Sequence, residues 1–106
     1  MFAVIYRWKL IPGRESEFEE GWRAGTEAIA NEFGGWGSRL HRGEDGTVLA
    51  YAQWPDRATW EKAMATRMHH SNDAARAKYR GAFERESFET LFAGEVVADL
   101  LDFRRG

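Results

Sequence analysis

The feature that most constrains the fold is the first segment of the chain, residues 2–11, in which every second side chain is apolar or aromatic. The even positions form one uninterrupted hydrophobic row: Phe2, Val4, Tyr6, Trp8 and Leu10. The odd positions begin apolar and end with Arg7 and Lys9. A period of two is typical of a β-strand, and Pro12-Gly13 supplies turn chemistry after it. We therefore predict a strand with one face buried throughout and the other covered only in part.

The next segment has the period of a helix. Ser16 followed by Glu19 is a capping-box pattern, and Gly34-Gly35 can provide a left-handed C-cap. Between them, apolar or small residues recur every three or four positions: Phe18, Trp22, Gly25, Ile29 and Phe33. We expect an amphipathic helix whose acidic opposite face, which includes Glu32, is solvated.

The rest of the chain predicts two helices and three strands. The glycines and Asp45 within residues 43–46 favour a hairpin turn, and Asp56 after Pro55 is a suitable N-cap. The expected strands span 36–42, 47–54 and 95–103, and the expected helices span 56–64 and 73–86. The order is β-α-β-β-α-β with the second helical element broken in two, which is the ferredoxin-like arrangement of an α+β protein with an antiparallel four-stranded sheet.

Both registers of the later strands carry apolar residues, so the sheet face that the helices leave open is also apolar. A surface of this kind is an association site. We expect a second copy of the chain to cover it, giving an isologous homodimer.

Composition limits the other possibilities. A chain of 106 residues with 43% apolar content encloses one core, so residues 1–106 are expected to form a single domain. A net charge of −2 with scattered basic residues does not favour nucleic acid. The apolar stretches are too short to cross a bilayer and the chain has no cysteine, so a soluble, cytoplasmic protein without membrane association is expected. Three histidines, two of them adjacent, do not predict a metal site.

Several short segments, in this order and spacing, resemble the antibiotic biosynthesis monooxygenase family. They are Val-Ile-Tyr-Arg-Trp-Lys-Leu-Ile-Pro-Gly-Arg-Glu at 4–15, the Trp22 helix ending at Gly34-Gly35, Gly-Ser-Arg-Leu-His at 37–41 and Tyr-Ala-Gln-Trp-Pro-Asp-Arg-Ala-Thr-Trp at 51–60. The resemblance covers residues 1–66 clearly and the last strand loosely. It implies a dimeric α/β barrel with a pocket between sheet and helices in each subunit. Members of the family include cofactor-independent oxygenases of aromatic polyketides and haem-degrading enzymes.

The haem-degrading branch uses an Asn on the first strand, a Trp on the helix after the third strand and a His as iron ligand. Here the Asn position falls on Tyr6 and the Trp position falls near Ala63. His69 and His70 lie in the region of the ligand, but an adjacent pair at a polar helix break is more typical of exposed or capping residues. The resemblance thus disfavours haem degradation, and no cofactor is expected.

Cofactor-free oxygenation needs an aromatic pocket, a proton acceptor or donor, and a cation to hold the substrate anion. The expected catalytic residues are Tyr6, His41 and Arg39, with His69 as a second candidate base and Arg7 as a second anion holder. The pocket is expected to contain Trp8, Tyr51, Trp54, Trp60 and His69.

Each candidate also has a purely structural interpretation. Tyr6 and Trp8 fit a core, whereas Arg39 and His41 fit a solvated strand face. Tyr79, Arg76 and Arg80 are interpreted as ordinary content of an amphipathic helix. Two functions stay open: a monooxygenase acting on a small aromatic or quinone-like substrate, and a non-catalytic module that binds a small ligand or associates through the same fold.

Overall fold

The computed structural model describes residues 1–101, which form a four-stranded sheet and three helices. The elements are β1 (Phe2–Lys9), α1 (Glu15–Phe33), β2 (Ser38–Arg42), β3 (Thr47–Trp54), α2 (Arg57–Ala65), α3 (Asp73–Arg80) and β4 (Glu89–Glu95). The sheet order is β2-β3-β1-β4 and every neighbouring pair is antiparallel. This is the predicted ferredoxin-like α+β fold. Within the described part of the chain, no helix has both the length and the apolar character needed to span a membrane.

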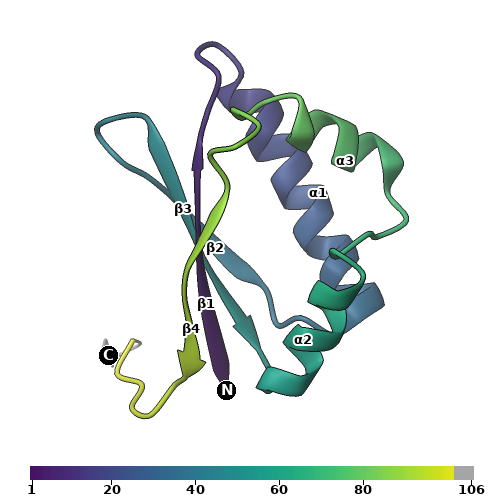
Figure 1. Cartoon of the computed structure of the whole chain (residues 1–106), viewed down its shortest axis with the longest axis vertical. Coiled ribbons are helices and arrows are strands. Elements are labelled where there is room, and N and C mark those ends of the chain that lie inside the picture. Colours follow the sequence, from purple (N-terminus) through teal and green to yellow (C-terminus); the bar gives the residue numbers. More distant parts are fainter. Residues whose placement is uncertain (102–106) are drawn as a thin grey trace, which may run out of the picture.

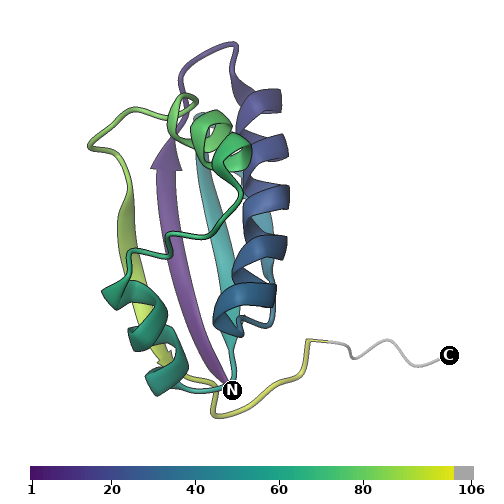
Figure 2. The ribbon, with the colours of Figure 1, turned by 90° about the vertical axis from the view of Figure 1, so that its right-hand side faces the viewer.

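All three helices lie on one side of the sheet (Figures 1 and 2). The even positions of β1 and β3 face them and form the core. Phe2, Val4 and the helical residue Phe18 have no exposed surface. Full burial of such a side chain stabilises the fold by about 1.5–3 kcal/mol. The alternating apolar row in residues 2–11 is therefore what attaches the helices to the sheet.

Several predicted boundaries are confirmed. Gly34 ends α1 with φ +80°, and the carboxylate of Asp56 accepts a hydrogen bond from the backbone N–H of Thr59 at the start of α2. The predicted capping box at Ser16 was wrong, because α1 begins at Glu15, so that Ser16 lies within the helix, and its N-cap, Arg14, makes no side-chain cap bond. The predicted helix 73–86 was too long, because α3 ends at Arg80 and the chain then pairs with the end of the first strand through Leu10 and Phe83.

The last strand was predicted at 95–103 but lies at Glu89–Glu95. Residues 96–100 have no regular secondary structure, and positions 102 and 103 lie outside the described residues. The alternation in β4 is broken by a shift in its pairing with β1: Ile5 pairs with Phe92, whereas the next residue, Tyr6, pairs with Thr90. An extra residue of this kind moves later side chains to the opposite face, so a pattern with a period of two fails to detect the strand.

Helices α1 and α3 lie in close contact at Gly21. A Cβ atom at this position would lie 2.6 Å from the backbone nitrogen of Tyr79 and 2.8 Å from the carbonyl oxygen of Ala75. Because both neighbours are backbone atoms, they cannot move without shifting α3.

We predict that Gly21→Ala lowers the free energy of unfolding by about 1–3 kcal/mol, because the added methyl overpacks the contact between the two helices. At a helix position without a close neighbour, the same change would stabilise by about 0.5–1 kcal/mol. Urea unfolding followed by tryptophan fluorescence measures the difference, and an unchanged or higher stability would contradict the close approach.

Candidate functional site

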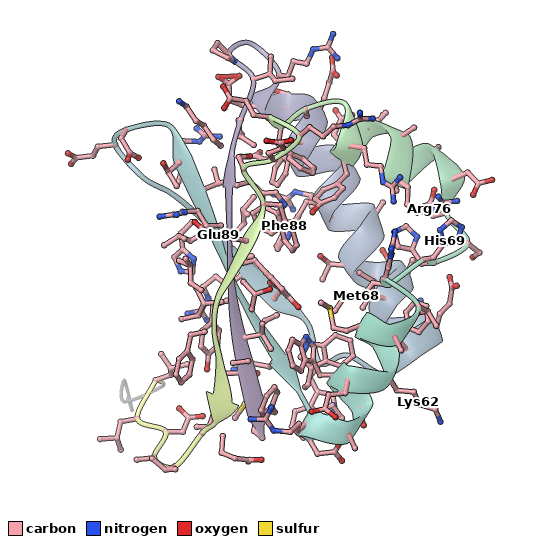
Figure 3. All side chains as sticks on the ribbon, viewed as in Figure 1. Lys62, Met68, His69, Arg76, Phe88 and Glu89 are labelled. Atoms are coloured by element: carbon pink, nitrogen blue, oxygen red, sulfur yellow. The ribbon has the colours of Figure 1, made fainter. Side chains whose placement is uncertain are left out.

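A pocket of about 420 Å³ lies between the sheet and the helices. Small residues create the space for it: Ala50 and Ala52 on β3, and Gly21 and Gly25 on α1, all of which line it. Figure 3 shows Met68 pointing from the loop between α2 and α3 toward the sheet, where it also lines the pocket. The volume is within the range of small-molecule sites.

Two tyrosine hydroxyl groups line the pocket, and each accepts a hydrogen bond from an indole. Trp60 Nε1 donates to the hydroxyl of Tyr6 at 2.9 Å, and Trp8 Nε1 donates to the hydroxyl of Tyr79 at 2.6 Å. Burial raises the pKa of both tyrosines above the ordinary value, and the indole bonds oppose this only in part. Both side chains are therefore neutral phenols near neutral pH.

His70 is the one buried polar or charged residue among the described residues, with 5% of its surface exposed. Its Nδ1 accepts a hydrogen bond from the backbone N–H of Asn72 at 3.2 Å, and the ring lines the pocket. Burial lowers the pKa of His70, and the nearby charge of Arg76 lowers it further, while Glu32 opposes the shift. The fold thus favours the neutral form of the imidazole.

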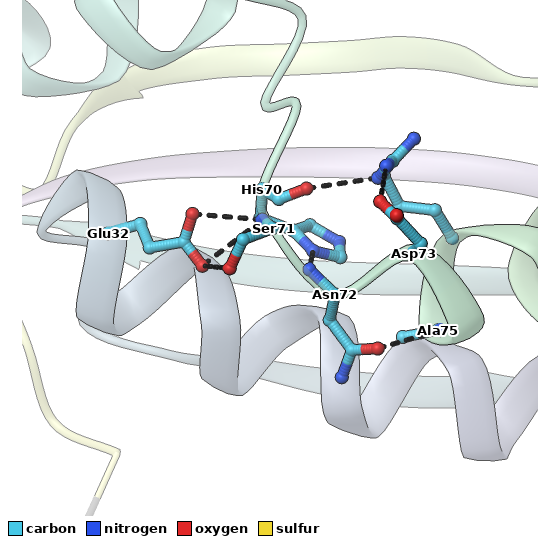
Figure 4. A network of polar contacts seen from close by, with 7 residues as sticks. Glu32, His70, Ser71, Asn72, Asp73 and Ala75 are labelled. Carbon is cyan, nitrogen blue, oxygen red and sulfur yellow. Dashed lines mark hydrogen bonds and ion pairs between the residues drawn. The ribbon is translucent and has the colours of Figure 1, made fainter.

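The loop that carries His70 is fixed at several points (Figure 4). The Glu32 carboxylate accepts hydrogen bonds from the Ser71 backbone N–H at 2.9 Å and from the Ser71 hydroxyl at 2.7 Å. The Asn72 side chain caps α3 by accepting from Ala75, and Arg76 Nε donates to the carbonyl of His70 at 3.0 Å. These contacts connect the loop to both α1 and α3.

The same loop contains two non-glycine residues in the left-handed region, Arg67 with φ +55° and Met68 with φ +50°. Such conformations cost about 1–3 kcal/mol each and persist where surrounding contacts determine them. Here the backbone N–H of Met68 donates to the carbonyl of Ala63, and that of His70 donates to the carbonyl of Met68. The strained turn brings both Met68 and His70 to the pocket.

Charge in the pocket is of one sign. Arg67, Arg76 and Arg80 contribute to the lining, and within residues 1–101 no Asp or Glu does. Trp54 adds a buried indole N–H that has no hydrogen-bond partner in the described part of the chain. The same residues contain no group of three or more His, Asp or Glu arranged to hold a metal ion. The three cationic side chains and the unpaired indole N–H suit a ligand with electron-rich oxygen atoms.

The structure separates the residues expected from the sequence into two groups. Tyr6, Trp8 and Trp54 line the pocket, and Trp60 supports it through its hydrogen bond to Tyr6. The others do not line it: Tyr51, Arg39, His41, His69 and Arg7.

These outlying residues have other surroundings. His41 is exposed on β2, with Nδ1 3.4 Å from the carbonyl oxygen of Leu49, and Arg39 borders a second cavity between α1 and β2. Arg7 forms an ion pair with Glu89 on β4. His69 lies on the outward side of the loop (Figure 3). No common site brings these residues together with Tyr6.

Sequence reasoning missed His70, Tyr79 and the arginines of α3. Tyr79 and Arg76 have the helical spacing of an ordinary amphipathic face, and nothing in that spacing distinguishes a pocket from a core. For the His69-His70 pair, the sequence offered the expectation of exposed or capping residues, which holds for His69 but not for His70. Asn72 is a recognisable N-cap that fixes the start of α3, but it does not indicate which of the two histidines is buried.

The fold is that of a ferredoxin-like α+β protein with an aromatic pocket between the sheet and the helices. A comparison with protein families matches residues 1–77 to the family described as antibiotic biosynthesis monooxygenase. The chain belongs to this family, as the resemblance of its strands and first helix predicted. A comparison with curated proteins finds no match.

Solved structures share the fold at low sequence identity. A crystal structure of an antibiotic biosynthesis monooxygenase has a TM-score of 0.64 and 18% identity, covering 92% of this chain and 100% of that chain. Rv0793 from Mycobacterium tuberculosis has a TM-score of 0.61 and 18% identity, covering 92% of this chain and 98% of that chain. PA3566 from Pseudomonas aeruginosa has a TM-score of 0.59 and 17% identity, covering 92% of this chain and 94% of that chain. At these identities the likeness establishes the fold alone.

The lowered pKa of His70 gives a prediction for stability. The folded protein binds fewer protons at this group than the unfolded chain, whose pKa is near the ordinary value of 6.5. The stabilising contribution is complete above about pH 6.5 and is lost as the pH falls through the folded-state pKa. We predict that the free energy of unfolding decreases as the pH is lowered from about 7.5 to 5.5, and that His70→Gln reduces this slope. Urea titrations at several pH values between about 7.5 and 5.5 measure the free energy of unfolding and its slope with pH.

The matched control is His69→Gln, which changes the exposed neighbour and should leave the slope contributed by His70 in place. A slope that is the same in His70→Gln and in the parent protein would show that His70 is not held neutral by the fold.

Proposed function

We propose that the chain is a cofactor-independent monooxygenase that acts on a small aromatic or quinone-like substrate in the pocket between the sheet and the helices. The observation that carries this proposal is the pocket itself, in which Tyr6, Tyr79 and His70 place polar groups among aromatic walls. Membership of the antibiotic biosynthesis monooxygenase family supports the reaction class.

The proposed reaction uses the electron-rich substrate anion as the reductant of dioxygen. An electron passes from the anion to dioxygen, and the carbon radical and superoxide combine to a peroxide anion. A proton from the solvent, equal to the one that the substrate lost, converts it to the hydroperoxide, and loss of water leaves a carbonyl group. Overall, a CH₂ group and O₂ become C=O and H₂O, so no external reductant is needed. The hydroxyl of Tyr6, neutral and held by Trp60, is suited to stabilise the developing oxyanion.

The second candidate function is a non-catalytic module that binds a small ligand in the same pocket. The observation in its favour is that the described lining contains neither a carboxylate nor a histidine with a free, unprotonated nitrogen directed at the ligand. A binding module requires complementarity of shape and polarity but no proton acceptor.

We predict protein-dependent oxygen consumption with anthrones and hydroxynaphthoquinols, after subtraction of spontaneous oxidation, and a loss of about 100-fold in turnover on Tyr6→Phe. An oxygen electrode measures the uptake on metal-free protein, and thermal unfolding verifies that the variant is folded. Tyr51→Phe is the matched control, because it removes the same hydroxyl from a residue outside the pocket.

No uptake, together with tryptophan quenching by the same compounds, would favour the binding module. His41→Ala tests the expectation that His41 takes part: unchanged turnover would confine the chemistry to the pocket, and a loss would move it to the exposed side of β2.

We also propose that a second copy of the chain covers the open face of the sheet. Ile5, Leu49, Tyr51 and Phe92 meet there through the pairing of β1 with β3 and β4, and Phe92 is 57% exposed. Light scattering at micromolar concentration should give the mass of a dimer, and Phe92→Glu should shift it toward the monomer because a charge would be buried in the contact. A monomeric parent protein would contradict this assembly.

A further inference from the structure

The position of the proton on the neutral His70 ring follows from the single hydrogen bond that the ring makes to the described residues. Nδ1 accepts from the Asn72 backbone N–H, so a neutral ring carries its proton on Nε2. Nε2 lies beside α1, 3.2 Å from where a Cβ on Gly25 would be, and no residue of the described chain bonds to it. His70 therefore offers a donor at the pocket and no lone pair.

The hydroxyl groups of the two pocket tyrosines are also hydrogen-bond donors rather than proton acceptors. The oxygen of Tyr6 already accepts from Trp60, and that of Tyr79 from Trp8. Each phenol keeps its own proton, which no acceptor in the described residues takes up. The two hydroxyl groups can thus donate to a ligand, and burial prevents them from ionising to act as bases.

The other ionisable side chains of the lining are all cations. They are Arg67, Arg76 and Arg80, whose guanidinium groups cannot accept a proton. Arg76 is directed by its bond to the His70 carbonyl and its ion pair with Asp73, and its side chain is 20% exposed. In the lining that residues 1–101 provide, every ionisable side chain is a donor or a cation.

We propose that the pocket selects ligands that are already anions in solution, such as acidic enols and hydroxyquinones, and that His70 Nε2–H is the specificity-determining donor to the anionic oxygen. The inference deepens the proposed function and rests on it for the use of this pocket. It narrows the preferred substrates from aromatic compounds in general to those that bind as anions, so anthrones and hydroxynaphthoquinols, which are mostly un-ionised at neutral pH, would react through the fraction that the solvent ionises. The protein then has no need to remove a proton, because the solvent has already done so.

The test uses two probes with the same ring system. 2-Hydroxy-1,4-naphthoquinone is ionised at neutral pH, whereas 2-methoxy-1,4-naphthoquinone cannot ionise. Isothermal titration of the full chain at pH 7 should show at least about tenfold tighter binding of the hydroxy compound, because the hydrogen bonds to an anion are charge-assisted. His70→Phe should remove most of this preference, whereas His69→Phe should retain it.

A second measurement needs no variant. The ¹⁵N chemical shifts of the His70 ring in the labelled protein should report a protonated Nε2 and an unprotonated Nδ1. The opposite tautomer, equal binding of the two probes, or no binding of the hydroxy compound would each overturn the inference. A preference for the anion without any oxygen uptake would support the inference and refute the oxygenase. Oxygen uptake together with equal binding of the two probes would support the oxygenase and refute the inference.

Discussion

The structure depends on the burial of one face of β1. This strand is bonded to β3 on one side and to β4 on the other, and its even side chains contact residues of the helices along its length. The same face supplies Tyr6 and Trp8 to the pocket. Core and site are consequently one continuous surface, and the pocket exists because Ala50 and Ala52 on the neighbouring strand do not fill the space that the large side chains leave.

Indole groups have two roles in this arrangement. Trp8 buries its large apolar ring and Trp60 buries part of its ring, and their N–H groups are satisfied by the hydroxyls of Tyr79 and Tyr6. Those bonds orient the phenols without consuming their protons. A packing requirement of the tryptophans therefore also determines the chemistry that the tyrosines present to a ligand.

The loop between α2 and α3 is held in place by backbone and side-chain hydrogen bonds. Its left-handed residues Arg67 and Met68 are held by backbone bonds, and Glu32 holds the following Ser71 from α1. The interpretation of Glu32 as part of a merely solvated face was too simple, because this exposed carboxylate connects α1 to the loop that positions His70.

How much the sequence could predict depended on the range of the interactions. Elements with an undisturbed period, such as the first strand and the 47–54 strand, were predicted nearly to the residue. The last strand was misplaced because a shift in pairing between Ile5 and Tyr6 of its partner is a property of two strands together. For the site, Tyr6, Trp8 and Trp54 could be predicted from their strand positions, whereas His70 could not be distinguished from His69.

The sequence by itself determined the order of elements, the end of α1 at Gly34, the start of α2 after Asp56, and the aromatic character of the surface between sheet and helices. These follow from local backbone preference and from side-chain period, which each segment carries on its own. Only the tertiary structure decided which of two adjacent histidines is buried, which nitrogen of His70 accepts a hydrogen bond, and that Tyr79 meets Trp8 across 71 positions of sequence. Those properties depend on contacts between segments far apart in the chain, and no local pattern encodes them.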